Sequence, residues 1–163
     1  MPLLLRPDKI YDQLESIEPT TLTTLGLRCL FVDIDNTLTP ADHSEINPSK
    51  LEWLKKVSET GIRIILISNN HGPRIDAIAK VTSLETYSFA LKPFSLVYRR
   101  ILTKYALKAH EVGVIGDQLL TDILGGNLRG FKTLYVHPIT SKDVFFTRLT
   151  RKIEGIMINR WKP

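Results

Sequence analysis

Short apolar runs alternate along the chain with longer segments in which apolar positions recur every three or four residues. A short run rich in β-branched residues is typical of a buried strand, whereas the longer spacing is typical of an amphipathic helix. The predicted strands are 28–34, 62–67, 86–90, 112–115 and 132–136. The predicted helices are 7–17, 47–61, 73–80, 94–107, 119–128 and 144–158, with 19–24 as a connection between elements.

This alternation of strands and helices predicts a parallel sheet, because parallel neighbours need a crossover segment that returns the chain to the same end of the sheet. We therefore predict a single α/β domain over residues 1–163, with a Rossmann-like, mostly parallel sheet and helices on both faces. In sheets of this kind, ligands bind in the crevice beyond the carboxyl ends of the strands.

Charged or hydroxyl side chains follow four of the predicted strands at the point where each strand ends. They are Asp33 with Asp35, Ser68, Lys92 and Asp117. Because the carboxyl ends of parallel strands meet at one edge, we expect these side chains to converge there.

Asp33 and Asp35 carry the most specific signal. Two carboxylates so close to each other repel unless a cation or a shared proton lies between them. A hard divalent metal such as Mg²⁺, held by oxygen ligands, is the functional interpretation. The structural alternative is an Asx turn that caps the end of the strand.

Composition agrees with an ordinary globular protein, since 43% of the 163 residues are hydrophobic and 24% are charged. The single cysteine, Cys29, cannot form an internal disulfide, so a disulfide-built secreted domain is not expected. No apolar run is long enough to cross a bilayer, and the apolar block at the start is too short for a secretory signal. We expect a cytoplasmic or organelle-matrix location.

The positive charge is concentrated in the last segment of the chain. Residues 141–163 contain six basic and two acidic residues, and so carry +4 of the net charge of +5. The charge distribution therefore predicts no nucleic-acid-binding face, and nothing indicates an obligate protein partner. The apolar stripe of this segment consists of Phe145, Leu149, Ile153, Ile156 and Met157. A basic amphipathic helix of this kind either lies on an anionic membrane, as a peripheral attachment, or packs on the sheet with its basic face in solvent.

Four motifs occur in a fixed order along the chain: Asp33–Thr37, Ser68–Asn69, Lys92–Pro93 and Gly116–Asp122. Together they resemble the motifs of the haloacid dehalogenase (HAD) superfamily of phosphatases, and the match covers about Leu30 to Val136. One motif is moderately specific, whereas four in order on the expected elements are highly specific.

The resemblance implies a reaction that proceeds through an aspartyl-phosphate intermediate, and it implies a role in that reaction for each motif residue. Asp33 would be the nucleophile, and Asp35 the general acid and base. Ser68, Asn69 and Lys92 would bind the phosphate. Mg²⁺ would be held by Asp33, by the backbone carbonyl of Asp35 and by Asp117. Asp122 would orient Lys92 or a metal-bound water, and Thr37 would make a secondary contact.

The sequence leaves no room for a cap domain, which many HAD enzymes close over their substrates. The two usual insertion points, 39–46 and 70–91, are too short to hold one. A capless site suits a substrate that covers the site itself, such as a protein, a nucleic acid or a lipid headgroup. His71 and Arg74, beside the second motif, are equally compatible with substrate contact and with a surface role in the loop.

The residues around the second and fourth motifs, and the opening Leu4–Asp8, look like those of the YqeG-like branch of the superfamily. That branch is similar to phosphatidylglycerophosphate phosphatases, which implies removal of the terminal phosphate from a phospholipid to give phosphatidylglycerol. Two alternatives remain: a phosphatase for a soluble phosphate ester or phosphoprotein, and a non-catalytic adaptor with this fold.

Overall fold

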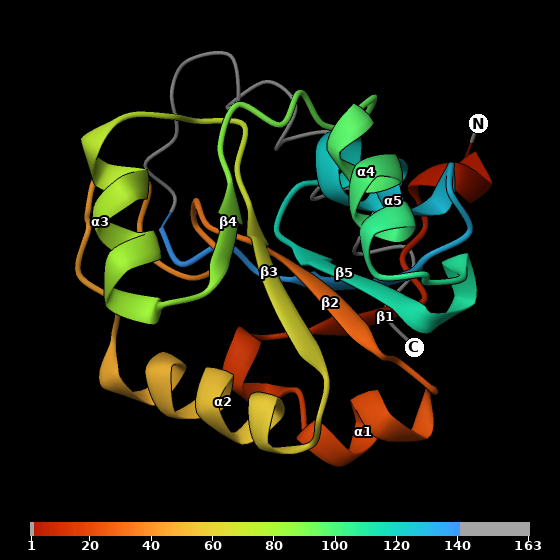
Figure 1. Ribbon diagram of the computed structural model, residues 1–163, viewed down its shortest axis with the longest axis horizontal. Coiled ribbons are helices and arrows are strands. Elements are labelled where there is room, and N and C mark those ends of the chain that lie inside the picture. Colours follow the sequence, from red (N-terminus) through yellow and green to blue (C-terminus); the bar gives the residue numbers. More distant parts are fainter. Residues whose placement is uncertain (1, 141–163) are drawn as a thin grey trace.

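Six parallel strands form the centre of the structure, a computed structural model that describes residues 2–140 (Figure 1). The strands lie in the order β1-β6-β5-β2-β3-β4. Their bounds are β1 Lys9–Tyr11, β2 Cys29–Asp33, β3 Arg63–Ile67, β4 Glu85–Tyr87, β5 Val112–Gly116 and β6 Lys132–Val136. Each neighbouring pair is parallel, so the predicted α/β architecture is confirmed.

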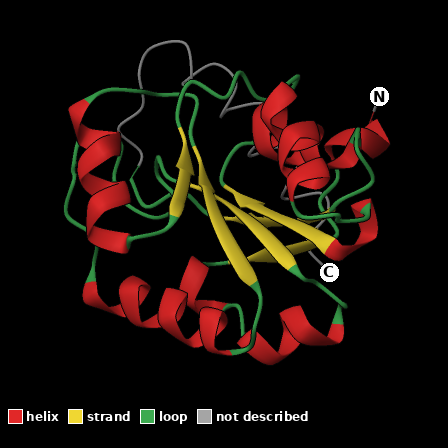
Figure 2. Cartoon of the chain, in the orientation of Figure 1, coloured by secondary structure: helices red, strands yellow, loops and turns green. Residues whose placement is uncertain are grey.

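Helices cover both faces of this sheet (Figure 2). The helices are α1 Pro19–Thr24, α2 Pro48–Glu59, α3 Pro73–Thr82, α4 Leu96–Lys104 and α5 Leu124–Asn127. Side chains of α1, α2 and α3 share one core with Leu30 and Val32 of β2. Side chains of α4 share the opposite core with Phe31, because successive residues of a strand point to opposite faces.

Helix α2 begins and ends where the sequence predicts. The Asn47 side chain accepts a hydrogen bond from the backbone N of Ser49 at 3.0 Å, and Pro48 occupies the first helical turn. Gly61 follows the helix with a φ of 85°, a conformation that favours glycine. Trp53 fixes the helix to the preceding segment, since its Nε1 donates to the carbonyl of Ile17 at 2.7 Å.

The predicted helix over 7–17 is wrong. Residues Lys9–Tyr11 instead form the edge strand β1, which pairs with β6, and Leu14–Ser16 form a short 3-10 turn. Ile10 and Leu14, which a helix would have placed on one stripe, pack into different apolar clusters. Hydrogen bonds to a distant strand have overridden a local spacing that resembled a helix.

The predicted connection over 19–24 is also wrong, because this segment is helix α1. Pro19 occupies its first turn, and Leu22 is fully buried against the sheet. The hydroxyl groups of Thr23 and Thr24 both donate to the carbonyl of Thr20, at 2.9 and 2.8 Å. One buried anchor and a favourable first residue therefore outweigh the weak helix propensity of threonine.

No helix in residues 2–140 is both long and apolar enough to span a membrane. The predicted helix over 144–158, and with it the basic amphipathic segment 141–163, lies outside the described residues.

A polar network joins β4 to helix α4 through the carboxylate of Glu85. It accepts hydrogen bonds from Lys104 Nζ at 2.8 Å, from the Tyr87 hydroxyl at 2.6 Å and from the Tyr105 hydroxyl. Burial alone would raise the pKa of Glu85, but these donors outweigh it and lower the pKa to about 2.

The pKa of Glu85 lies below the ordinary value of 4.5, so its ionised form stabilises the folded state above that pH. We expect this contribution to be lost as the pH falls from 4.5 towards 2. Glu85→Gln should therefore lower the thermal midpoint at neutral pH, and its difference from wild type should shrink on acidification. Thermal unfolding measured across this pH range tests the prediction, with Glu59→Gln at an exposed position of α2 as the control. A difference that stays constant with pH contradicts it.

Candidate active site

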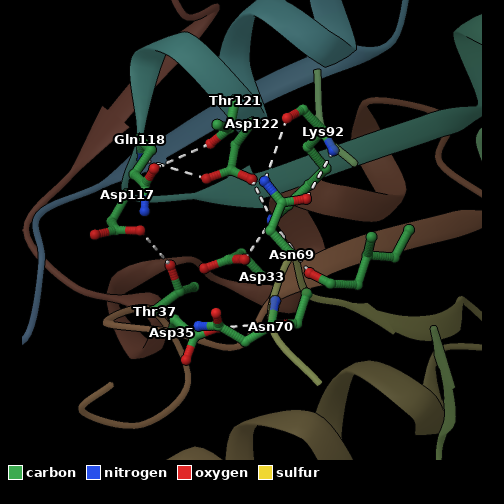
Figure 3. Close-up of polar contacts among 12 residues, drawn as sticks. Asp33, Asp35, Thr37, Asn69, Asn70, Lys92, Asp117, Gln118, Thr121 and Asp122 are labelled. Atoms are coloured by element: carbon green, nitrogen blue, oxygen red, sulfur yellow. Dashed lines mark hydrogen bonds and ion pairs between the residues drawn. The ribbon is translucent and has the colours of Figure 1, made fainter. Parts of the chain in front are cut away.

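The carboxyl ends of the central strands bring polar side chains from four segments into one cluster (Figure 3). Asp33 is the last residue of β2, Ser68 follows β3, and Asp117 follows β5. Because β2 lies between β3 and β5, Asp33 takes the central position. Lys92 enters from the connection between β4 and α4, and Asp122 enters from the π-helical turn Leu119–Ile123 after β5.

The Lys92 ammonium group is almost fully buried and surrounded by oxygen atoms. Its Nζ donates to Asp122 Oδ1 at 2.7 Å and to the carbonyl of Ile67 at 3.2 Å, and forms an ion pair with Asp33 Oδ1. Burial acts to lower the pKa of Lys92, but Asp122 and Asp33 outweigh it and hold that pKa well above its usual value. Lys92 is therefore a fixed positive charge beside Asp33.

The Asp33 carboxylate is held on one side only. Its Oδ1 contacts Lys92, whereas its Oδ2 is buried and has no hydrogen-bond partner among the described residues. Burial raises the pKa of Asp33 well above its usual value, and the charges of Asp122, Asp117 and Asp35 add to this effect against the opposing charge of Lys92. A buried carboxylate oxygen without a partner is costly, so this atom is suited to a cation or to a bound reactant.

Three carboxylates meet at this position. Oxygen atoms of Asp33, Asp117 and Asp122 lie within 4.8 Å of one another, and Figure 3 shows the three groups facing one another. Both oxygens of Asp122 already accept hydrogen bonds, Oδ1 from Lys92 at 2.7 Å and Oδ2 from the backbone N of Gln118 at 3.2 Å. Asp33 Oδ2, which has no partner among the described residues, and the nearby Asp117 carboxylate are oxygen ligands of the kind that Mg²⁺ prefers.

Two further residues support these carboxylates. The buried Thr37 hydroxyl donates to Asp117 Oδ1 at 3.4 Å. Gly116 allows Asp122 to approach the strand end, since a Cβ at residue 116 would lie 2.3 Å from the Asp122 carboxyl carbon. Any other residue at this position would displace Asp122 and with it Lys92.

Asp35 lies at the edge of the cluster and is held by two donors. Its Oδ2 accepts a hydrogen bond from the Ser68 hydroxyl at 2.7 Å, and its Oδ1 pairs with the Arg74 guanidinium group. Arg74 also donates to the carbonyl of His43 at 3.1 Å. It extends from α3 towards the β2–α2 connection, and its side chain is 21% exposed, so it can meet a ligand that enters from solvent.

Comparison with known proteins establishes the family. Residues 2–140 match the model of the family described as mitochondrial PGP phosphatase. The chain belongs to the PGP phosphatase family. It is 33% identical to "Probable phosphatase YqeG" of Bacillus subtilis, over 96% of this chain and 91% of that protein. It is also 27% identical to chloroplastic phosphatidylglycerophosphate phosphatase 1 of Chlamydomonas reinhardtii, over 99% of this chain but 62% of that longer protein.

Solved structures confirm the HAD-like fold. One of them is the 3-deoxy-D-manno-octulosonate 8-phosphate phosphatase of Moraxella catarrhalis, solved with a magnesium ion, a phosphate ion and a KDO molecule. The TM-score is 0.53 at 15% identity, and the match covers 86% of this chain and 91% of that one. At this identity the likeness concerns the fold alone.

One predicted phosphate ligand of this PGP phosphatase family member has a second task. The Asn69 side chain accepts a hydrogen bond from the backbone N of Lys92 at 2.7 Å and donates to its carbonyl at 3.2 Å. The second motif therefore holds the third in place, a relation that sequence spacing did not predict.

Arg129 is a residue that the sequence did not predict for the site. Its guanidinium group donates to the carbonyls of Pro93 at 2.8 Å, Ser95 at 2.9 Å and Gly125 at 3.0 Å, and it lies 4.8 Å from the centre of the Tyr98 ring. It thus fixes the segment that carries Lys92 to helix α5. No sequence signal identifies it, because its partners are carbonyl groups whose positions depend on the fold.

We expect Arg129→Met to lower kcat about tenfold, because a small displacement of Lys92 weakens its interaction with the reacting group. Three carbonyls also lose their donor, so the free energy of unfolding should fall by about 1–3 kcal/mol. Steady-state kinetics and urea unfolding test both parts, with Arg6→Met at an exposed position as the control. Unchanged kcat in a destabilised protein would show that Arg129 supports only the fold.

Proposed function

We propose that this phosphatase removes the terminal phosphate of phosphatidylglycerophosphate, with Asp33 as the nucleophile. The observation that carries the proposal is the environment of the Asp33 carboxylate. It is buried at the end of the central strand, with one oxygen paired to Lys92 and the other without a partner among the described residues. That environment suits a carboxylate that binds phosphorus beside a cation.

The chemistry requires two transfers. Asp33 attacks phosphorus, the bond from phosphorus to the glycerol oxygen breaks, and Asp35 gives that oxygen its proton. Water then attacks the phosphorus of the aspartyl-phosphate, Asp35 takes a proton from the water, and Asp33 is restored as inorganic phosphate leaves. For the first transfer Asp35 must first take up a proton from solvent. An incoming phosphate would compete for the Arg74 guanidinium group and so free Asp35 Oδ1 to carry that proton.

Ser68, Asn69 and Lys92 form the proposed phosphate-binding set. The Ser68 hydroxyl has one hydrogen, which it now donates to Asp35, so it must turn to donate to a phosphate. Asn69 Nδ2 has two hydrogens, of which one is used by the carbonyl of Lys92. The three hydrogens of Lys92 Nζ are used by Asp33, by Asp122 and by the carbonyl of Ile67, so Lys92 would stabilise the transferring group through its charge.

Asp33 and Asp117, together with the backbone carbonyl of Asp35, are the residues that would hold Mg²⁺. When bound, this ion would neutralise charge on the phosphoryl oxygens. We assign Asp122 to the positioning of Lys92, because its Oδ1 accepts a hydrogen bond from the Lys92 ammonium and its Oδ2 accepts one from the backbone N of Gln118. Thr37 orients Asp117.

Two observations support a lipid substrate. The match to the PGP phosphatase family covers residues 2–140, and one relative carries the name of that activity, although this chain spans only 62% of its length. The connections from β2 to α2 and from β3 to β4 contain no domain-sized insertion that would enclose a small substrate. Such an open site accepts a phosphate that remains attached to a membrane.

Phosphate release from phosphatidylglycerophosphate in mixed micelles tests the function, measured beside a panel of soluble phosphate esters and a phosphopeptide. We expect lipid turnover to exceed turnover of each soluble compound, to require Mg²⁺ and to stop on addition of a chelator. Faster turnover of one soluble ester would overturn the lipid assignment. No hydrolysis of any compound with Mg²⁺ would favour the adaptor alternative.

A further inference from the structure

A group of large apolar side chains is exposed immediately beside the active site. They belong to the rim segment, residues 89–96, which connects β4 to the start of α4. The exposed fractions are 60% for Phe89, 61% for Leu91, 75% for Phe94 and 82% for Leu96. Among the large apolar residues of the described chain, only Val81 on α3 reaches a comparable exposure, at 62%.

The backbone of the rim segment holds these side chains outward. Phe89 and Leu91 have φ values of 49° and 57°, in the left-handed region that bulky residues rarely adopt. Between and after them, Ala90 and Lys92 are buried. Two backbone hydrogen bonds fix this alternation of exposed and buried residues. The N of Phe89 donates to the carbonyl of Asn70 at 3.0 Å, and the N of Ala90 donates to the carbonyl of Ser68 at 2.9 Å.

The same segment therefore performs two tasks. It directs Lys92 inward to Asp33, and it presents apolar side chains to the exterior on both sides of Lys92. Exposing several large side chains in a strained, well-anchored loop is costly for a protein that does not use them, so the exposure points to a contact surface.

Positive charge lies next to these apolar side chains on α4. Arg99 and Arg100 are exposed, and no carboxylate of the described residues pairs with either. With Leu96, Thr103 and Lys104 they line an open groove of about 470 Å³. Figure 1 shows the connection from β4 crossing the edge of the sheet at the strand carboxyl ends to reach α4.

We propose that the rim segment and the start of α4 dock on an anionic lipid bilayer, with Phe94 and Leu96 in the apolar interface and Arg99 and Arg100 at the phosphate headgroups. Apolar anchors beside guanidinium groups that no carboxylate of residues 2–140 pairs with match the layered chemistry of such a surface. The proposal rests on the proposed lipid substrate and deepens it. Because Lys92 lies within the docking segment, a docked protein would face headgroup phosphates with its Asp33 side, and no cap would be needed.

The test is co-sedimentation of the full-length chain with vesicles of phosphatidylglycerol and phosphatidylcholine, compared with vesicles of phosphatidylcholine alone. We expect Phe94→Ser with Leu96→Ser to weaken binding to the anionic vesicles at least about tenfold, since two large side chains would leave the apolar phase. Val81→Ser, an equally exposed apolar residue on α3, is the matched control and should bind as wild type does. Residues 141–163 stay unchanged in every variant, so any contribution of this segment to vesicle binding is the same in all of them.

A second pair of variants tests the charges without altering the rim segment. Arg99→Gln with Arg100→Gln should remove most of the preference for anionic over neutral vesicles. Lys55→Gln with Lys56→Gln on α2, where both lysines are already in ion pairs, should leave that preference intact. Comparison of the arginine variant with the lysine variant tests the docking proposal by itself if the serine variant proves unstable.

Turnover of a soluble phosphate ester separates docking from catalysis. The Phe94/Leu96 variant and the Arg99/Arg100 variant should both keep the wild-type rate on the soluble ester and lose most of their activity on phosphatidylglycerophosphate in vesicles. Equal vesicle binding by wild type and both variants, or no binding by wild type, would overturn the docking proposal. If vesicle binding depends on these residues but the protein does not hydrolyse the lipid, the docking proposal is supported and the proposed function is overturned.

Discussion

Asp33→Asn is expected to reduce phosphate release by at least about 1,000-fold, because an amide cannot form the aspartyl-phosphate. The loss should appear with every substrate, lipid or soluble, since each would pass through the same residue. Rapid acid quenching followed by mass spectrometry should find a phosphoryl group on the peptide that contains Asp33 in the wild-type protein and none in the variant.

The protein should remain folded in this variant. Burial and the three neighbouring carboxylates raise the pKa of Asp33, so they oppose its charge, and a neutral side chain of the same shape relieves that repulsion. We therefore expect a thermal midpoint, measured without divalent ions, that is equal to or above that of wild type. Asp12→Asn, an identical change at an exposed position, is the control. Retention of more than a tenth of the activity by Asp33→Asn would exclude Asp33 as the nucleophile.

Lys92→Gln is expected to have the second largest effect, lowering kcat about 100- to 1,000-fold, as is typical when a fixed electrostatic donor is removed. It should also destabilise the fold, because Asp33 and Asp122 would lose the cation buried between them. Removing one partner of a buried ion pair costs about 3–5 kcal/mol. Lys80→Gln on the exposed side of α3 is the matched control for both measurements.

A double variant separates the two effects of Lys92. In Asp33→Asn with Lys92→Gln, the buried pair is replaced by two neutral amides, so part of the lost stability should return while activity stays absent. Urea unfolding of the two single variants and the double variant gives the coupling free energy. If the changes in unfolding free energy of the two single variants simply add in the double variant, the ion pair seen between Asp33 and Lys92 does not stabilise the protein.

Local sequence patterns were sufficient where an element is regular and buried. The dense apolar runs that became β2, β3, β5 and β6 were predicted at nearly their observed positions, as was helix α2 with its asparagine cap. Local patterns failed at the start of the chain, where the spacing of Ile10, Leu14 and Ile17 resembles one stripe of a helix. Pairing with β6, a strand more than a hundred residues away, decided that segment, and no local pattern contains this information.

The candidate site shows the same division. Spacing and residue type were enough to single out Asp33, Asp35, Ser68, Lys92 and Asp117, because strand ends of a parallel sheet share an edge. The resemblance assigned Asp117 to the metal and left Asp122 either to Lys92 or to a metal-bound water. The structure adds the contacts of Asp122, which accepts hydrogen bonds from Lys92 and from the backbone N of Gln118.

By itself, the sequence determined the α/β architecture, the edge of the sheet that carries the chemistry and the types of group gathered there. These features follow from short-range periodicity and from the rule that strand ends converge. The tertiary structure alone decided the clamp of Asn69 on Lys92, the three carbonyl contacts of Arg129 and the outward rim of Phe89, Leu91, Phe94 and Leu96. Hydrogen-bond partners and exposure depend on which distant segments pack together, and that is set by the whole fold.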